Sequence, residues 1–215
     1  NFSVWADELR MIGKTTDSDV QKQKLNAFIT DKFKKNMVAK DAELADYMKR
    51  YSLYSMQQYR TRYLLAKLTQ FVDMAYKGLK VAGSLDDYTV LEIEHILPNN
   101  PKASLRADFV AKNAKIDYDE YKNKLGNLTL LEKPINIIAS NDFFTNKRPE
   151  YKKCKYYLTS SIVELNTVGK NSSINRINKK VQAFSEWTAK SIDTRQAMLI
   201  ALAKEIWKTE EIEIA

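Results

Sequence analysis

The only histidine among the 215 residues, His95, lies in a segment whose residue types suit hydrolytic chemistry. The segment LEIEHILP, residues 91–98, places a carboxylate, Glu94, directly before the imidazole and ends at Pro98. Imidazole is the side chain whose ordinary pKa lies nearest neutrality, so it can take a proton from water. A neighbouring carboxylate can bind a metal ion that activates the same water. The segment therefore predicts a site for general-base chemistry assisted by a metal.

A second segment downstream supports this prediction. Residues 125–136, LGNLTLLEKPIN, hold a turn at Gly126 and Asn127, a short run typical of a β-strand, and a second asparagine, Asn136. A single histidine is also compatible with a purely structural role, and that alternative stays open from His95 alone. The order and spacing of the two segments together favour catalysis.

Composition bounds the class of protein. With 44% hydrophobic residues the chain can bury a core, as one large domain or two small ones. No apolar run approaches the roughly 20 residues of a membrane span, and no secretory signal is recognisable, so we expect a cytoplasmic protein with no membrane partner. The single cysteine, Cys154, cannot form an internal disulfide, which fits a reducing compartment. One cysteine and one histidine cannot complete a structural zinc site, so no zinc is expected.

The net charge of +8 favours an anionic partner, nucleic acid before a membrane surface. Five cations gather against one acid shortly after the second segment: Lys147, Arg148, Lys152, Lys153 and Lys155, with Glu150. Two interpretations stay open. The cluster is either a surface that holds the phosphates of a nucleic-acid backbone or a solvated helix face.

Helices are expected before the histidine segment, because residues 1–82 contain no proline and show apolar residues at helical spacing. The periodic positions are Leu25, Phe28, Ile29 and Phe33, then Met56, Tyr59, Tyr63, Phe71 and Ala75. Gly78 suits the C-terminal end of the second of these helices. Residues 83–87 are expected to form a linker.

Two short strands are expected around the site, at residues 90–96 and 128–131. Pro98 ends the first strand, because proline cannot donate to a ladder of hydrogen bonds. Residues 99–124 are expected to form a loop with one or two short helices. Pro134 suits the first turn of a helix that follows the second strand.

The chain beyond Asn146 is expected to be helical again. Asp193, with Gln196 three residues on, has the pattern of a helix N-terminus. An apolar stripe follows at Leu199, Leu202, Ala203, Ile206 and Trp207. Phe184, Trp187 and Trp207 are expected in the core rather than as platforms for stacked bases.

In these motifs the chain resembles a known family. Residues 94–98 (EHILP), then 125–131 (LGNLTLL), then Asn136 and Ser140-Asn141 resemble the HNH (ββα-metal) endonucleases. Within them, the resemblance is to the C-terminal nuclease family of GmrSD-type modification-dependent restriction and phage-defence systems. The tail also resembles the closing helices of that family, at Trp187, Ile192, Arg195, Ile206 and Trp207. The resemblance implies a mainly α fold with a small ββα-metal (HNH) centre, and helices before and after a two-stranded hairpin.

The resemblance also implies a role for each motif residue. His95 would be the general base that deprotonates the attacking water, and Glu94 would bind the metal. Asn127 would pin the loop between the two halves of the motif. Asn136 on the following helix would supply a second metal ligand. Oxygen ligands of this kind suit a hard cation, most simply Mg²⁺ with Mn²⁺ as a substitute.

Substrate contacts are expected beside this centre. Ser140 lies one helical turn after Asn136, so Ser140 or the adjacent Asn141 would add a ligand or a phosphate contact. Lys147, Arg148 and Lys152 would hold the flanking backbone, which positions DNA without reading its sequence.

The expected organisation is a helical segment at 1–85 packing on the nuclease core, an HNH core at 86–150, and C-terminal helices at 151–215 that complete the same domain. The expected function is metal-dependent endonucleolytic hydrolysis of DNA in restriction or anti-phage defence. The alternatives are a catalytically degenerate DNA-binding or scaffolding module and an RNA-directed nuclease. GmrSD-type proteins usually carry an N-terminal sensor and NTPase domain, but this chain has no glycine-rich phosphate loop. Either a domain or subunit of that kind is absent from this chain, or the chain is a stand-alone nuclease.

Overall fold

The computed structural model describes residues 2–53, 56–170 and 172–207, and of residues 36–39 and 41–42 it describes only the backbone. The described residues fall into two compact units. The first holds residues 2–47 and Trp207, and the second holds residues 48–206. The motif residues from Glu94 to Asn141 all lie in the second unit.

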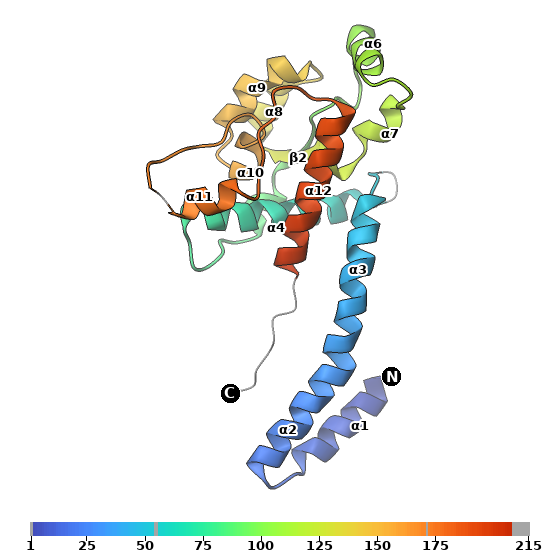
Figure 1. The fold of residues 1–215 in the computed structure, drawn as a ribbon, viewed down its shortest axis with the longest axis vertical. Coiled ribbons are helices and arrows are strands. Elements are labelled where there is room, and N and C mark those ends of the chain that lie inside the picture. Colours follow the sequence, from blue (N-terminus) through green and yellow to red (C-terminus); the bar gives the residue numbers. More distant parts are fainter. Residues whose placement is uncertain (1, 54–55, 171, 208–215) are drawn as a thin grey trace. The chain divides into compact units, whose positions relative to one another are not determined.

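The first unit consists of α1 (Phe2–Gly13), α2 (Ser18–Ile29), the π-helical turn η1 (Thr30–Lys34) and most of α3 (Lys35–Lys49), the blue helices of Figure 1. The carboxylate of Asp17 caps α2 by accepting hydrogen bonds from the N–H groups of Asp19 and Val20. The expected apolar stripe is only partly correct, because Phe28 is buried but Phe33 is 44% exposed.

The second unit begins with a long helix and continues through the two strands and a set of shorter helices. Its elements in chain order are α4 (Gln58–Lys77), α5 (Asp86–Thr89), β1 (Glu92–His95), α6 (Ala103–Lys112), α7 (Tyr118–Lys122), the 3₁₀ turn η2 (Leu125–Asn127), β2 (Leu128–Leu131), α8 (Lys133–Ala139), α9 (Phe144–Lys153), α10 (Tyr157–Ser160), α11 (Ser172–Asn178) and α12 (Ala189–Ile206).

The two strands pair antiparallel, with Glu92 opposite Leu131 and His95 opposite Leu128. The second strand has the expected bounds, and Pro134 lies in the first turn of α8 as expected. The first strand is shorter than residues 90–96, and the expected linker at 83–87 runs into α5. Every residue of β2 is buried, so this strand lies inside the unit.

Helix α4 forms the main support of the sheet, because it packs against β2, α10, α11 and α12. Gly78 ends this helix in the left-handed conformation, at φ 65°, as expected. The expected helix is confirmed, but not all of its periodic positions lie on the buried face. Tyr59 and Tyr63 are 64% and 46% exposed. The buried face instead contains Thr61, Leu64, Leu65, Leu68, Thr69 and Val72.

Helix α12 starts earlier than the sequence pattern indicated. Asp193 lies inside the helix and is not its N-cap. Thr188 and Ser191 form the cap instead, since each hydroxyl accepts a hydrogen bond from the backbone N–H of the other residue. Phe184 and Trp187 are buried as expected, whereas Trp207 is only half-buried and lies outside the core of the second unit.

The fold class is confirmed: the described chain is mainly helical and has one two-stranded antiparallel sheet. Within residues 48–206, α4 of the expected first segment, the sheet, and α12 of the expected third segment pack together. None of the described helices is both long and apolar enough to cross a membrane.

Candidate active site

The imidazole of His95 lies at the end of β1, where the chain leaves the sheet. The side chain is half-buried, and its Nε2 atom is buried without a hydrogen-bond partner among the described residues. Burial is the main cause that lowers the pKa of His95 to about 4, and the charges of Lys147 and Lys122 contribute to the same shift. The imidazole is therefore neutral near pH 7 and has a nitrogen that can accept a proton.

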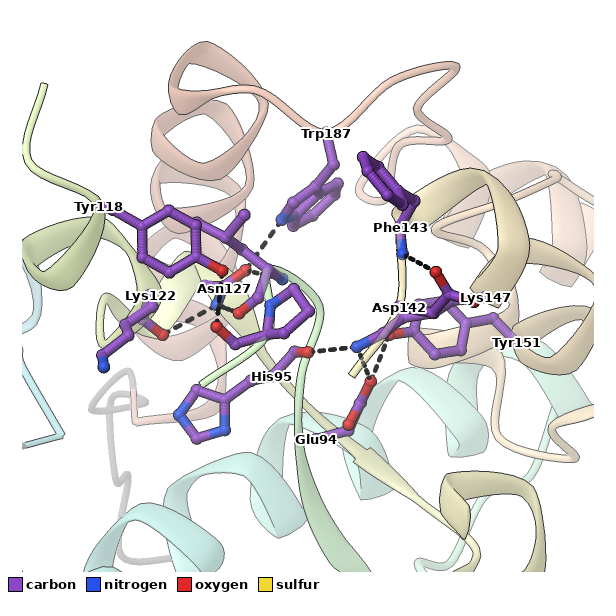
Figure 2. A network of polar contacts seen from close by, with 12 residues as sticks. Glu94, His95, Tyr118, Lys122, Asn127, Asp142, Phe143, Lys147, Tyr151 and Trp187 are labelled. Carbon is purple, nitrogen blue, oxygen red and sulfur yellow. Dashed lines mark hydrogen bonds and ion pairs between the residues drawn. The ribbon is translucent and has the colours of Figure 1, made fainter. Parts of the chain in front are cut away.

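The neighbouring carboxylate of Glu94 is buried in an ion pair. Its Oε1 atom accepts hydrogen bonds from Nζ of Lys147 and from the hydroxyl of Tyr151, each at 2.7 Å. Lys147 also donates to the backbone oxygen of His95 at 2.7 Å, so one ammonium joins both motif residues (Figure 2). The helix α9 supplies both donors. Because both bonds end on Oε1, the second oxygen of Glu94 stays available to another ligand.

The side chain of Asn127 holds the loop that follows His95. Its amide nitrogen donates to the backbone oxygens of Leu97 and Lys122, each at 2.8 Å. Its oxygen accepts from the N–H of Leu97 at 2.7 Å and from the indole N–H of Trp187 at 2.8 Å. The fully buried side chain thus joins the His95 loop to α7 and to the segment before α12. The indole contact was not anticipated from the sequence, which indicated only that Trp187 is buried.

The turn before β2 is fixed by α12. Arg195 is fully buried and donates through Nη1 to the backbone oxygens of Gly126 and Leu128, at 2.9 and 2.7 Å. Gln196 accepts from the N–H of Gly126 at 3.1 Å. A Cβ atom on Gly126 would lie 2.1 Å from the backbone oxygen of Ile192, so only glycine fits there. These contacts explain why the tail residues belong with the motif.

The structure does not join the remaining motif residues to Glu94 and His95 by polar contacts. Asn136 is half-buried on α8, which packs against β1. Ser140 lies outside the helix at its C-terminal cap, with φ 49°, so the expectation that it shares a helix face with Asn136 was wrong. Ser140 and Asn141 are exposed, as a substrate contact requires.

The basic cluster is not a uniform cationic surface. Lys147 is 1% exposed and bonded to Glu94, so it is not available to an external phosphate. Arg148 is partly buried and donates to the backbone oxygens of Phe184 and Val163. Lys152 remains exposed but pairs with Glu164 at 2.5 Å. Sequence alone could not distinguish these environments, since all three residues are equally charged.

Helix α7 contributes two further residues to the site, and no sequence pattern indicated them. The hydroxyl of Tyr118 donates to the backbone oxygen of Pro98 at 2.7 Å. Nζ of Lys122 donates to the backbone oxygen of Asn99 at 3.1 Å. Both side chains therefore hold the end of the loop that starts at His95.

The comparison with protein families agrees with this geometry. The family model of the GmrSD restriction endonuclease C-terminal domain matches residues 38–202. No curated protein and no solved structure gives a significant match. The matched range includes every motif residue from Glu94 to Gln196. The chain belongs to the family of GmrSD restriction endonuclease C-terminal domains, and its function is that of a restriction-type nuclease.

Proposed function

We propose that this chain is an HNH-type endonuclease that hydrolyses phosphodiester bonds in DNA with His95 as the general base. The observation that carries the proposal is the neutral imidazole, whose buried Nε2 lacks a partner in the described structure. A buried polar atom without a partner costs free energy, and a catalytic role is one explanation of such an atom. Strongly shifted pKa values cluster at functional sites.

In the proposed reaction the chain's own residues position and activate the water. His95 accepts a proton from water as the new oxygen–phosphorus bond forms and the bond to the leaving sugar oxygen breaks, and that oxygen takes up a proton from solvent water. Lys147 donates a hydrogen bond to the backbone oxygen of His95, and Asn127 fixes the loop that follows His95. A base held in this way contributes about 10²–10⁴ in rate.

We propose that the chain binds one hydrated hard cation. No group of three or more histidine, cysteine or acidic side chains gathers in the part of the chain that the structure describes. Any ion would therefore depend on few protein ligands and on water. The second oxygen of Glu94 is one candidate ligand, and the amide oxygen of Asn136 is the other. Mg²⁺ or Mn²⁺ in that place would withdraw charge from the phosphate.

A second candidate is a nucleic-acid-binding module without catalysis. One observation favours it: the ammonium of Lys147 already lies on one oxygen of the carboxylate proposed at the metal. The two candidates predict the same binding of nucleic acid but differ in turnover.

A plasmid-relaxation assay with Mg²⁺ or Mn²⁺, with and without chelator, tests the proposal. Wild-type chain should nick or cut, and His95→Ala should lose about 10²–10⁴ in rate while it melts at nearly the wild-type temperature. Glu94→Ala and Asn136→Ala should each raise the metal concentration needed. Retention of wild-type nicking by folded His95→Ala would remove the base assignment. A parallel assay on RNA decides between the two nucleic acids.

A further inference from the structure

The last residue of α7, Lys122, is a largely buried lysine at the candidate site. Lysine is seldom buried unless its charge is compensated. Its Nζ atom donates to the backbone oxygen of Asn99 at 3.1 Å and pairs with Oδ1 of Asp119 at 2.8 Å. An ammonium has three donors, so these two contacts leave one N–H for a further acceptor.

The ammonium is held on the same side of the loop as the base. Asn127 bonds the backbone oxygen of Lys122 to the loop after His95, and Tyr118 bonds α7 to Pro98. Figure 2 shows the Lys122 side chain and the His95 imidazole extending from this junction in the same direction. The cation is also one of the charges that lower the pKa of His95, as expected of a close neighbour.

The charge of Lys122 is only partly neutralised. Asp119 is shared, because its Oδ1 atom pairs with Lys122 while its Oδ2 atom lies 2.5 Å from Arg106. Lys122 and Arg106 therefore share the carboxylate of Asp119, and the side chain of Arg106 is 45% exposed. Lys122 and Arg106 thus carry two positive charges against the one carboxylate that they share.

We propose that the Lys122 ammonium binds a nonbridging oxygen of the scissile phosphate, next to the water that His95 deprotonates. This inference rests on the proposed nuclease function. A fixed ammonium at that place stabilises the negative charge that grows on the phosphate oxygens as the water attacks. It also anchors the phosphate in the ground state, so both binding and turnover depend on it.

The test compares four variants of the full chain in plasmid cleavage and in binding of a labelled duplex in chelator, measured by anisotropy over a salt series. Lys122→Met should lower the cleavage rate about 10²-fold, as removal of one preorganised donor does. It should also reduce the slope of log K against log salt by roughly 0.9. Lys122→Arg keeps the charge and should restore most of both signals. Lys35→Met, which removes an exposed cation paired with Asp31, should leave cleavage unchanged.

Asp119→Asn separates phosphate binding from a structural role. It removes the partner of the ammonium but keeps the cation, so binding should be unchanged or tighter. A purely structural Lys122 predicts instead that Asp119→Asn reproduces the losses of Lys122→Met, and that result overturns the inference. The inference is also overturned if Lys122→Met has the same cleavage rate and the same salt slope as the wild type. If the wild type cleaves neither DNA nor RNA, the proposed function fails, while the salt slopes still decide whether Lys122 contacts phosphate. If Lys122→Met does not fold, the results for Asp119→Asn and Lys122→Arg decide whether the inference holds.

Discussion

Nζ of Lys147 lies 2.7 Å from Oε1 of Glu94, and both side chains are almost fully buried where α9 meets β1. Burial lowers the pKa of Lys147, whereas the charge of Glu94 acts in the opposite direction. The same ammonium holds the backbone of His95. The stability of the fold and the position of the candidate base therefore depend on one ion pair.

Loss of either partner of this pair should be costly, because the other charge stays buried. We expect Glu94→Gln or Lys147→Met to lower the free energy of unfolding by roughly 3–5 kcal/mol in urea denaturation. The double variant should regain part of that loss. Lys112→Met is the matched control, since Lys112 pairs with Asp108 at 2.9 Å and the two side chains are 60% and 41% exposed, and about 1 kcal/mol or less is expected there. Equal effects in the two pairs would contradict this account.

Acid should destabilise the fold through His95. Its pKa of about 4 lies below the ordinary 6.5, so above pH 6.5 the imidazole is neutral in both the folded and unfolded states. As the pH falls from 6.5 toward 4, the imidazole binds a proton in the unfolded chain but not in the folded chain. The free energy of unfolding should drop by about 2 kcal/mol between pH 7 and about pH 4.5 from this group. His95→Gln should flatten that part of the profile, and an identical profile in the variant would assign the acid sensitivity to other groups.

Asn127→Ala should destabilise the fold more than a comparable asparagine substitution. It leaves the N–H groups of Leu97 and Trp187 and two backbone oxygens buried without partners. Each such group costs about 1–3 kcal/mol, so a loss of roughly 3 kcal/mol or more is expected. Asn123→Ala is the control, because that side chain is also buried but makes one bond, to the backbone oxygen of Asp119. Similar unfolding midpoints for both variants would refute the pinning role.

Gly126→Ala should separate η2 from α12. The new methyl group would overlap the backbone oxygen of Ile192 and approach Gln196, and the side chain of Arg195 bonds the Gly126 backbone to the same helix. We expect a loss of about 3 kcal/mol or more, at the upper end for overpacked sites. Gly13→Ala, at a position with nothing within 4 Å of the new Cβ, should change the midpoint little. Thermal melting of both variants checks the contrast.

The predictable parts of the fold are those that depend on residues close together in the sequence. The Leu128–Leu131 strand, the Pro134 helix start and the Gly78 helix end follow from backbone preferences of a few residues. The errors concern information that is not local. The tyrosines of α4 have helical spacing but face solvent, because the sheet covers the neighbouring face.

The candidate site shows the same division. The position of His95 at a strand end followed from its motif, whereas the burial of Lys147 depends on the fit of α9 against β1. Lys122 belongs to no sequence motif. Its place beside the loop is fixed by the contact of Asn127 with its backbone oxygen and by the contact of Tyr118 with Pro98. Charge counts along a sequence do not tell a solvated cation from an internal one.

The hydrogen bond between Trp187 and Asn127 spans 60 residues of sequence, and the contacts of Arg195 with the same turn span more. A growing chain emerges from the ribosome N-terminus first, so the His95 loop exists well before its last two partners are made. Until α12 has emerged, Asn127 lacks an indole donor and the 126–128 backbone lacks its guanidinium. The loop after His95 therefore gains its contacts with Trp187 and Arg195 only after residues 187–195 have been synthesised.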